Sequence, residues 1–194
     1  MAEAASRAGR HLACRPGCTP CCIGPFPVTA LDAWRLRKGL AALVEDDPER
    51  ARAVVERARQ SWETLRDRFP GDRERGVFSD DESAEDRFCA TFDQEACPAL
   101  DPEAGTCDLY AWRPTSCRTF GPPMRIGDED VPPCALCFTA ASPAETERAR
   151  ATLEVGDLED QLAAALAARG EGGDTIVAAA LALAPAPPRD VTRA

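Results

Sequence analysis

The sequence predicts a mainly α-helical protein: a helical hairpin and C-terminal helices around an irregular, cysteine-rich metal-binding region. Two stretches before residue 70 and one after residue 140 carry apolar residues at helical spacing. All ten cysteines fall outside these stretches. We therefore expect a cysteine-cluster metal-binding domain over residues 1–140, with the hairpin at 29–69 inside it. Helices at 141–184 should pack on this domain, and 185–194 should form a disordered tail.

The first two helices have clear start signals. Thr29 is suited to cap a helix over about 29–45, and Pro48 occupies the favoured first position of a second helix over about 48–69. Residues 71–87 are charged and irregular, which predicts a loop. Residues 88–137 are rich in Pro, Gly and Cys and lack an amphipathic period, so their order should depend on bound metal.

The C-terminal part carries the same kinds of signal. Ser142 and Pro143 predict the start of a third helix that runs through Leu153 and, after a break near Gly156, on to Gly170. Asp174 is suited to cap a short helix that continues to Leu183. Trp34 and Trp62 fall on apolar helix faces and are expected in the core.

Charge and hydropathy exclude several classes of function. The formal net charge is −10, which argues against non-specific binding to nucleic acid or to anionic membranes. No stretch approaches the length of a transmembrane helix, and the N-terminus lacks the apolar region of a secretory signal. We therefore expect a cytoplasmic protein whose thiols stay reduced, so that metal binding is favoured over disulfides.

The spacing of the cysteines indicates the chemistry of the site. Four of them lie within nine residues near the start of the chain, and five more lie between residues 97 and 137, inside the predicted irregular region. Gaps of two and three residues let one turn of backbone direct several sulfurs at a common point, as zinc and iron–sulfur sites require. The candidate metal ligands are Cys14, Cys18, Cys21, Cys22, Cys97, Cys107, Cys117, Cys134 and Cys137. Cys89 lies outside the close spacing and is expected to pack as a small apolar side chain.

The cysteine motifs resemble the bacterial YkgJ-like cysteine-cluster family, described as zinc- or iron-chelating domains. The first motif ends in Cys18, Cys21 and Cys22, although three residues rather than two separate Cys14 from Cys18. The second motif is matched by Cys97, Leu100, Cys107, Tyr110, Arg113, Pro114, Cys117 and Arg118. The resemblance covers about residues 14–137 and implies metal chelation, with Cys134 or Cys137 as a further ligand.

The residues leave the metal open between an iron–sulfur cluster, with [4Fe–4S] favoured, and Zn²⁺. The adjacent Cys21 and Cys22 are awkward ligands for one tetrahedral ion and more easily serve two sites or two metals of a cluster. Arg113 and Arg118 flank Cys117 and are candidate cluster-binding residues, because guanidinium donors stabilise an anionic cluster. Hydrogen bonding to loop carbonyls is the alternative role for both.

Two other metal motifs fit poorly. The spacing of Cys14, Cys18 and Cys21 also matches the radical S-adenosylmethionine motif, but Pro20 stands where an aromatic residue is usual and the strand–helix alternation of a barrel is missing. His11 is the only histidine, which disfavours zinc fingers of the nucleic-acid-binding type, and it is expected to be solvated.

The expected function is therefore metal or iron–sulfur binding in an electron-transfer, sensing or accessory role. A structural zinc module that presents the helices to a protein partner is one alternative. A component of a protein-modifying enzyme is another, because some relatives in the resembled family carry the motif within methyltransferases. No catalytic residue is predicted, since no Ser-His-Asp set, phosphate loop or Cys–His pair is visible.

Overall fold

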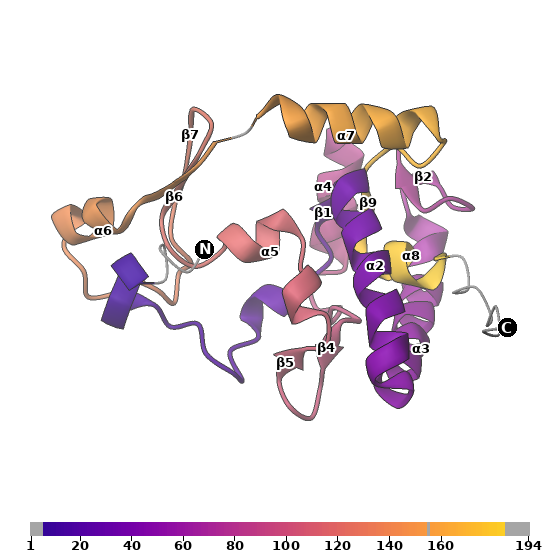
Figure 1. Ribbon diagram of the computed structural model, residues 1–194, viewed down its shortest axis with the longest axis horizontal. Helices are drawn as coiled ribbons and strands as arrows, with labels where there is room; N and C mark the ends of the chain where they lie inside the picture. The colour runs from indigo at the N-terminus through magenta and orange to yellow at the C-terminus, as the bar shows by residue number, and fades with distance from the viewer. Residues whose placement is uncertain (1–5, 155, 185–194) are drawn as a thin grey trace, which may run out of the picture.

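The computed structural model describes residues 6–154 and 156–184, and it is mainly α-helical, as the sequence predicts (Figure 1). The expected tail at 185–194 lies outside the described residues. The N-terminal cysteine segment and residues 92–137 carry only short elements among the described residues. These are the 3₁₀ helices η1 (Gly9–His11), η2 (Pro20–Cys22) and η4 (Tyr110–Trp112), the five-residue helix α5 (Thr115–Thr119), and two- and three-residue strands. Within the described residues, no helix is both long and apolar enough to span a membrane.

The predicted hairpin is confirmed as α2 (Ala30–Asp46) and α3 (Pro48–Leu65), followed by the 3₁₀ helix η3 (Arg66–Arg68). The Thr29 side chain accepts a hydrogen bond from the Asp32 amide. Asp47 directly precedes Pro48, and its side chain accepts a hydrogen bond from the Arg50 amide. Each cap satisfies one amide that the first helical turn leaves unpaired. The chain can therefore reverse direction between two helices with a single residue, Asp47, between them.

The C-terminus of the described chain completes the core. Helix α8 (Val177–Ala182) packs against both α2 and α3, and strand β9 (Thr175–Ile176) pairs antiparallel with β1 (Pro27–Val28). Leu36, Val54 and Leu181 meet there and are almost completely buried. Burial of each such side chain contributes about 1.5–3 kcal/mol. The residues around 176–182 are thus part of the same core as the hairpin.

The expectation of an irregular loop over residues 71–87 is wrong. Strands β2 (Gly71–Asp72) and β3 (Val77–Phe78) form a small hairpin, and helix α4 (Glu82–Thr91) follows. The Asp81 side chain caps α4 by accepting a hydrogen bond from the Ala84 amide at 3.1 Å. Phe88 then packs edge-on against the Phe69 ring. A cap and one aromatic anchor hold this short helix, so no repeating apolar stripe was needed to form it.

The prediction of a long third helix is also wrong. Helix α6 (Pro143–Ala149) starts with the expected Ser142 cap, but residues Ala151–Leu153 form strand β8, and helix α7 (Asp157–Ala168) follows. Strand β8 pairs in parallel with β6 (Met124–Ile126), which pairs antiparallel with β7 (Glu129–Val131). Asp174 does not cap a helix, because Thr175 and Ile176 are extended and α8 begins at Val177. Pairing with a distant strand overrides local helix propensity at both places.

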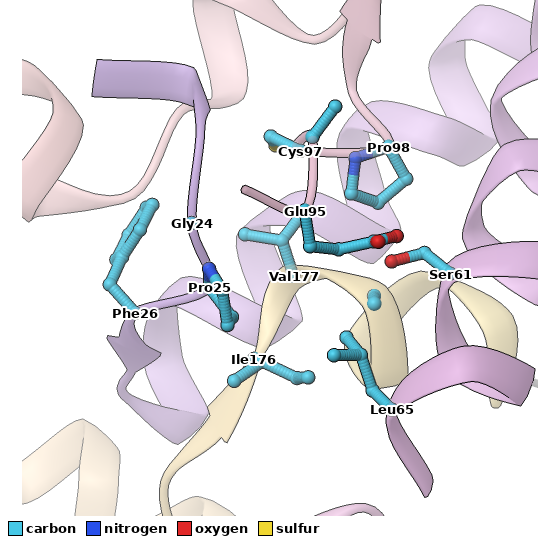
Figure 2. Close-up of a pocket in the computed structure, with 12 residues that line it drawn as sticks. Gly24, Pro25, Phe26, Ser61, Leu65, Glu95, Cys97, Pro98, Ile176 and Val177 are labelled. Atoms are coloured by element: carbon cyan, nitrogen blue, oxygen red, sulfur yellow. The ribbon is translucent and has the colours of Figure 1, made fainter. Parts of the chain in front are cut away.

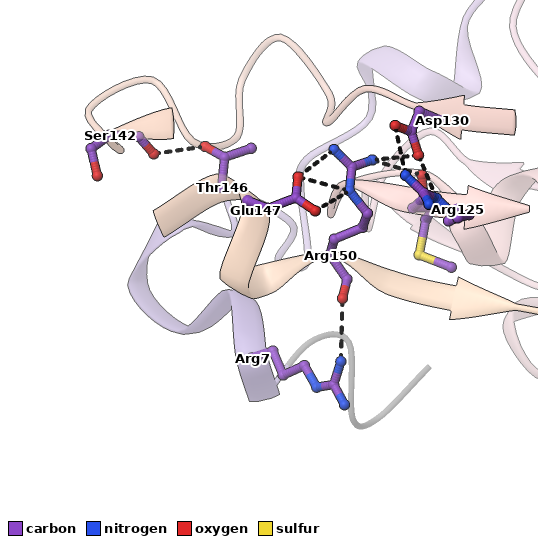
Figure 3. A network of polar contacts seen from close by, with 8 residues as sticks. Arg7, Arg125, Asp130, Ser142, Thr146, Glu147 and Arg150 are labelled. Carbon is purple, nitrogen blue, oxygen red and sulfur yellow. Dashed lines mark hydrogen bonds and ion pairs between the residues drawn. The ribbon is translucent and has the colours of Figure 1, made fainter. Parts of the chain in front are cut away.

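An arginine-centred network holds this small sheet to α6 and to the N-terminal segment (Figure 3). The Arg150 guanidinium contacts Glu147 at 2.8 Å and Asp130 at 3.2 Å, and Asp130 also pairs with Arg125. Arg7 donates a hydrogen bond to the Arg150 carbonyl at 3.2 Å. The network therefore ties the start of β8 to residues before the first cysteine.

The two tryptophans that were expected in the core differ in burial. Trp62 is buried in an aromatic cluster with Phe69, as expected. The expectation for Trp34 is wrong, since its side chain is 37% exposed and lies under the Lys38 ammonium at 5.3 Å. The core face of α2 is filled by smaller neighbours such as Ala33 and Leu36, which leaves the indole at the edge.

Candidate metal centre

The structure divides the candidate ligands between two neighbourhoods. We call Cys22, Cys97, Cys107 and Cys117 the inner thiol group and Cys14, Cys18, Cys134 and Cys137 the outer thiol group. The charge on each of the other three inner thiols affects the pKa of Cys22. The charges on Cys137 and Cys18 likewise affect the pKa of Cys14. Cys21 lies between the groups, because its charge affects both Cys14 and Cys117.

Backbone pairing brings the first three inner thiols together. The Cys97 amide donates to the Cys22 carbonyl at 2.8 Å, and Ile23 and Ala96 form a β-bridge. Strand β4 (Leu100–Asp101) then pairs with β5 (Thr106–Cys107), with Leu100 opposite Cys107. Main-chain hydrogen bonds therefore connect the segments that carry three of the four inner thiols.

A buried carboxylate anchors the Cys107 loop to α3. Only 1% of the Asp108 side chain is exposed, and its two oxygens contact Arg50 Nε and Arg57 Nη2, each at 2.5 Å. Arg57 Nε also donates to the Pro98 carbonyl at 2.9 Å, next to Cys97. Paired charges of this kind make a buried carboxylate tolerable and fix its position. The loop that carries Cys107 is therefore held against the hairpin.

A second buried carboxylate positions Cys117. Helix α5 (Thr115–Thr119) begins after η4 (Tyr110–Trp112), and both oxygens of Asp32 on α2 accept from the Thr115 amide at 3.0 Å. Burial raises the pKa of the Asp32 carboxyl, and the hydrogen bonds from Thr115 oppose that shift. Sequence reasoning missed Asp32 and Asp108 as positioning residues, since their partners lie 83 and more than 50 residues away.

The outer group gathers where the N-terminal segment meets the segment after β7. The Phe138 amide donates to the His11 carbonyl at 2.9 Å, and the Ala13 amide points to the Cys137 sulfur at 3.3 Å. The Cys134 amide donates to the Gly121 carbonyl at 3.1 Å. A Cβ atom on Gly121 would lie 3.1 Å from the Cys14 sulfur, so only glycine fits there without displacing that thiol.

Four of these thiols, Cys14, Cys97, Cys107 and Cys117, lie in surroundings that disfavour their anions. Burial raises the pKa of Cys97 and of Cys117 to about 12 each and also raises that of Cys107. Burial and the neighbouring Cys137 raise the pKa of Cys14 to about 11. At neutral pH these thiols are protonated, so a metal ion that binds them must displace protons.

The adjacent thiols of Cys21 and Cys22 influence each other's pKa directly. A side-chain hydrogen bond between the two raises the pKa of Cys21 and lowers the pKa of Cys22. Cys22 belongs to the inner group, whereas Cys21 faces both groups. This division fits the expectation that adjacent cysteines serve different sites.

Comparison with known proteins agrees with this arrangement. Residues 13–137, more than half of the 194-residue chain, match the family CxxCxxCC, described as "Putative zinc- or iron-chelating domain". The chain belongs to the CxxCxxCC family. The match extends from just before Cys14 to Cys137 and so includes both thiol groups. No curated protein and no solved structure matches the chain.

The donor chemistry of this CxxCxxCC chain fits zinc or an iron-containing centre, since both accept four cysteine thiolates. All ten cysteines are described and all are free. Across residues 6–154 and 156–184, however, no three Cys, His, Asp or Glu side chains lie close enough together to hold one metal ion.

The two candidate arginines make loop contacts. Arg118 Nε donates to the Arg113 carbonyl at 2.9 Å, and its Nη2 donates to the Ala111 carbonyl. Arg113 stacks on the Tyr110 ring at 3.8 Å, and its positive charge lowers the pKa of Cys107 and Cys117 against the larger effect of burial. The guanidinium of Arg113 thus lies where it would favour bound thiolates; that either arginine binds a cluster stays a prediction.

Other sequence candidates fall outside both groups. Cys89 on α4 packs beside the aromatic cluster of Phe69, Phe78 and Phe88, and burial raises its pKa to about 11. His11 was expected to be solvated, which is wrong: its side chain is 16% exposed and stacks on Phe138. The 3₁₀ turn at η1 directs the ring inward, a contact that sequence spacing does not encode.

A small cavity of about 20 Å³ adjoins the inner group behind Cys97 (Figure 2). Apolar side chains, including Leu65, Ile176 and Val177, form most of its wall. The Ser61 hydroxyl is buried there without a hydrogen-bond partner among the described residues, and Figure 2 shows the Glu95 carboxylate pointing toward it. The cavity is of a size for one water molecule. On this side, Cys97 faces the protein core.

Proposed function

We propose that this chain holds two thiolate-bound metal centres, one in each thiol group, and that at least the inner centre is an iron–sulfur cluster. The observation that carries the proposal is the convergence of the inner thiols. They come from four separate segments of the chain and share one electrostatic environment.

An iron–sulfur cluster accommodates thiols from separate segments more easily than a single zinc ion does. Zinc holds four sulfurs at about 2.3 Å, so the sulfurs must nearly touch. In a four-iron cluster each cysteine binds a different iron, and the sulfurs stand farther apart. Thiols that come from four separate segments, as in the inner group, suit this wider arrangement.

The surroundings support a redox, sensing or accessory role. Cys97 and Cys107 pack against the main core, whereas Tyr110 is 64% exposed and Trp112 is 36% exposed beside them. A centre placed there would be rigidly held yet close to the surface, where an electron donor or a partner protein can approach. We place this chemistry in the cytoplasm, where thiols stay reduced.

A structural zinc module is the second candidate. It is favoured by the contact of Cys97 and Cys107 with the core of α2, α3 and α8, because metal at the inner group would then stabilise the packing of the hairpin. The exposed Tyr110 and Trp112 would in that case belong to a surface for a protein partner.

Anaerobic purification followed by iron, zinc and acid-labile sulfide assays and visible spectroscopy tests the proposal. We expect brown protein with broad visible absorption and with sulfide that matches iron. Colourless protein with stoichiometric zinc would instead establish the structural module. Less than about half an equivalent of iron plus zinc would refute both candidates.

Single substitutions then test the division into two groups. Cys107→Ser should remove the inner centre, and Cys137→Ser should remove the outer one, each with about half of the metal lost. Cys89→Ala is the matched control and should retain all of it. Complete loss from either serine variant would mean that the thiols form one centre.

A further inference from the structure

A second cavity lies away from the thiol sulfurs and has no assigned role. Its volume is about 440 Å³, within the range of small-molecule sites. Residues from the N-terminal segment, α2, α5, β6, β8 and α7 line it. Figure 1 shows α5 between α2 and the β6–β7 hairpin, with α7 crossing above. The cavity therefore lies where the helical core meets the small sheet.

The charged lining is strongly positive for so acidic a chain. Arg7, Arg35 and Arg118 contribute three positive charges, and Glu159 contributes one negative charge. The local sum is +3 − 1 = +2, whereas the whole chain carries −10. Opposite charge in a cavity wall of this kind is what draws in a small anion.

Arg35 is the least satisfied of these groups. Its Nε is buried and has no hydrogen-bond partner among the described residues, and no ion pair involves its guanidinium there. The nearby Asp32 carboxylate interacts electrostatically with Arg35, but its hydrogen bonds come from Thr115 and not from Arg35 Nε. A buried guanidinium nitrogen without an acceptor is costly, so an external acceptor is the expected partner.

The other two arginines are held in place. Arg118 is fixed by its bonds to the Arg113 and Ala111 carbonyls, and Arg7 by its bond to the Arg150 carbonyl. Both guanidinium groups are thus oriented before any ligand arrives, which lowers the entropy lost on binding.

The rest of the wall suggests what accompanies the anionic group. Met124 and Leu153 provide an apolar surface beside the arginines. We propose that this cavity binds a small phosphate monoester, with the phosphate at Arg35 and Arg118 and the organic part against the apolar wall. A phosphate monoester carries about −1.5 to −2 at pH 7, opposite in sign to the arginines of the wall. Guanidinium groups also match phosphate oxygens in pairs.

Isothermal titration calorimetry on the metal-loaded full chain tests the proposal, with glycerol 3-phosphate, inorganic phosphate and succinate as probes. We expect saturable one-site binding of glycerol 3-phosphate, weaker binding of inorganic phosphate and the weakest binding of succinate. No binding of either phosphate probe would overturn the proposal. Binding of succinate as tight as that of glycerol 3-phosphate would overturn the assignment to phosphate.

Three variants separate specific recognition from general charge. Arg35→Gln should weaken glycerol 3-phosphate binding by about tenfold or more, because one charge-assisted contact is lost. Arg125→Gln removes the same charge outside the cavity and should change affinity less than about twofold. Equal losses of affinity in Arg35→Gln and Arg125→Gln would overturn the assignment of the site to this cavity. Glu159→Gln removes the opposing charge and should tighten binding; unchanged or weaker binding would overturn the proposal even if Arg35→Gln failed to fold.

Discussion

Replacing Asp108 with asparagine tests how the Cys107 loop is held. Asp108 is 1% exposed, while its partners Arg50 and Arg57 are 43% and 26% exposed. Removal of one partner from a fully buried ion pair costs about 3–5 kcal/mol. Both arginines can regain water here, and asparagine keeps one acceptor oxygen, so the expected loss is that of one charge-assisted hydrogen bond, about 2 kcal/mol.

This loss should lower the melting temperature by about 4–8 °C in a chain of this size. Thermal unfolding followed by circular dichroism, with and without metal, measures it. Asp130→Asn is the control, because that carboxylate also pairs with two arginines but is 50% exposed. A melting temperature for Asp108→Asn no lower than that of Asp130→Asn would refute the view that the buried pairs hold the loop.

Three further predictions concern packing, pH and metal removal. Gly39→Ala on α2 should lower the melting temperature, because a Cβ atom at this position would lie 2.4 Å from Trp112 Cγ. Alanine has the better helix propensity, so a higher melting temperature would contradict this prediction. Affinity for Zn²⁺ in competition titrations should rise by about tenfold or more per pH unit between pH 6 and 8. Burial raises the thiol pKa of Cys97 and Cys117 to about 12, so each thiolate that binds metal must first release a proton. An affinity that does not change with pH would count against thiolate ligation. Chelation should reduce amide protection more in residues 88–137 than in α2 and α3 in hydrogen-exchange measurements, and equal protection in both regions would show that metal does not order the cysteine-rich segment.

Sequence alone determined the parts of this protein that depend on neighbours within about one helical turn. The caps at Thr29 and Ser142 and the start at Pro48 are local hydrogen-bond and backbone effects, so they could be predicted. The spacing of the cysteines likewise identified the metal-binding chemistry, because ligand type and gap length do not depend on the fold. The same local rules failed at residues 151–153, where a strand partner lies about 27 residues away.

Only the tertiary structure decided how those parts combine. The allocation of Cys22 and Cys117 to one thiol group depends on which segments pair across the fold, and spacing carries no information about that. Asp108 and the cavity arginine Arg35 are ordinary charged residues in sequence; burial and the presence or absence of a distant partner give them their roles. The physical reason is that desolvation and charge pairing act through space, between residues that the chain brings together only when it has folded.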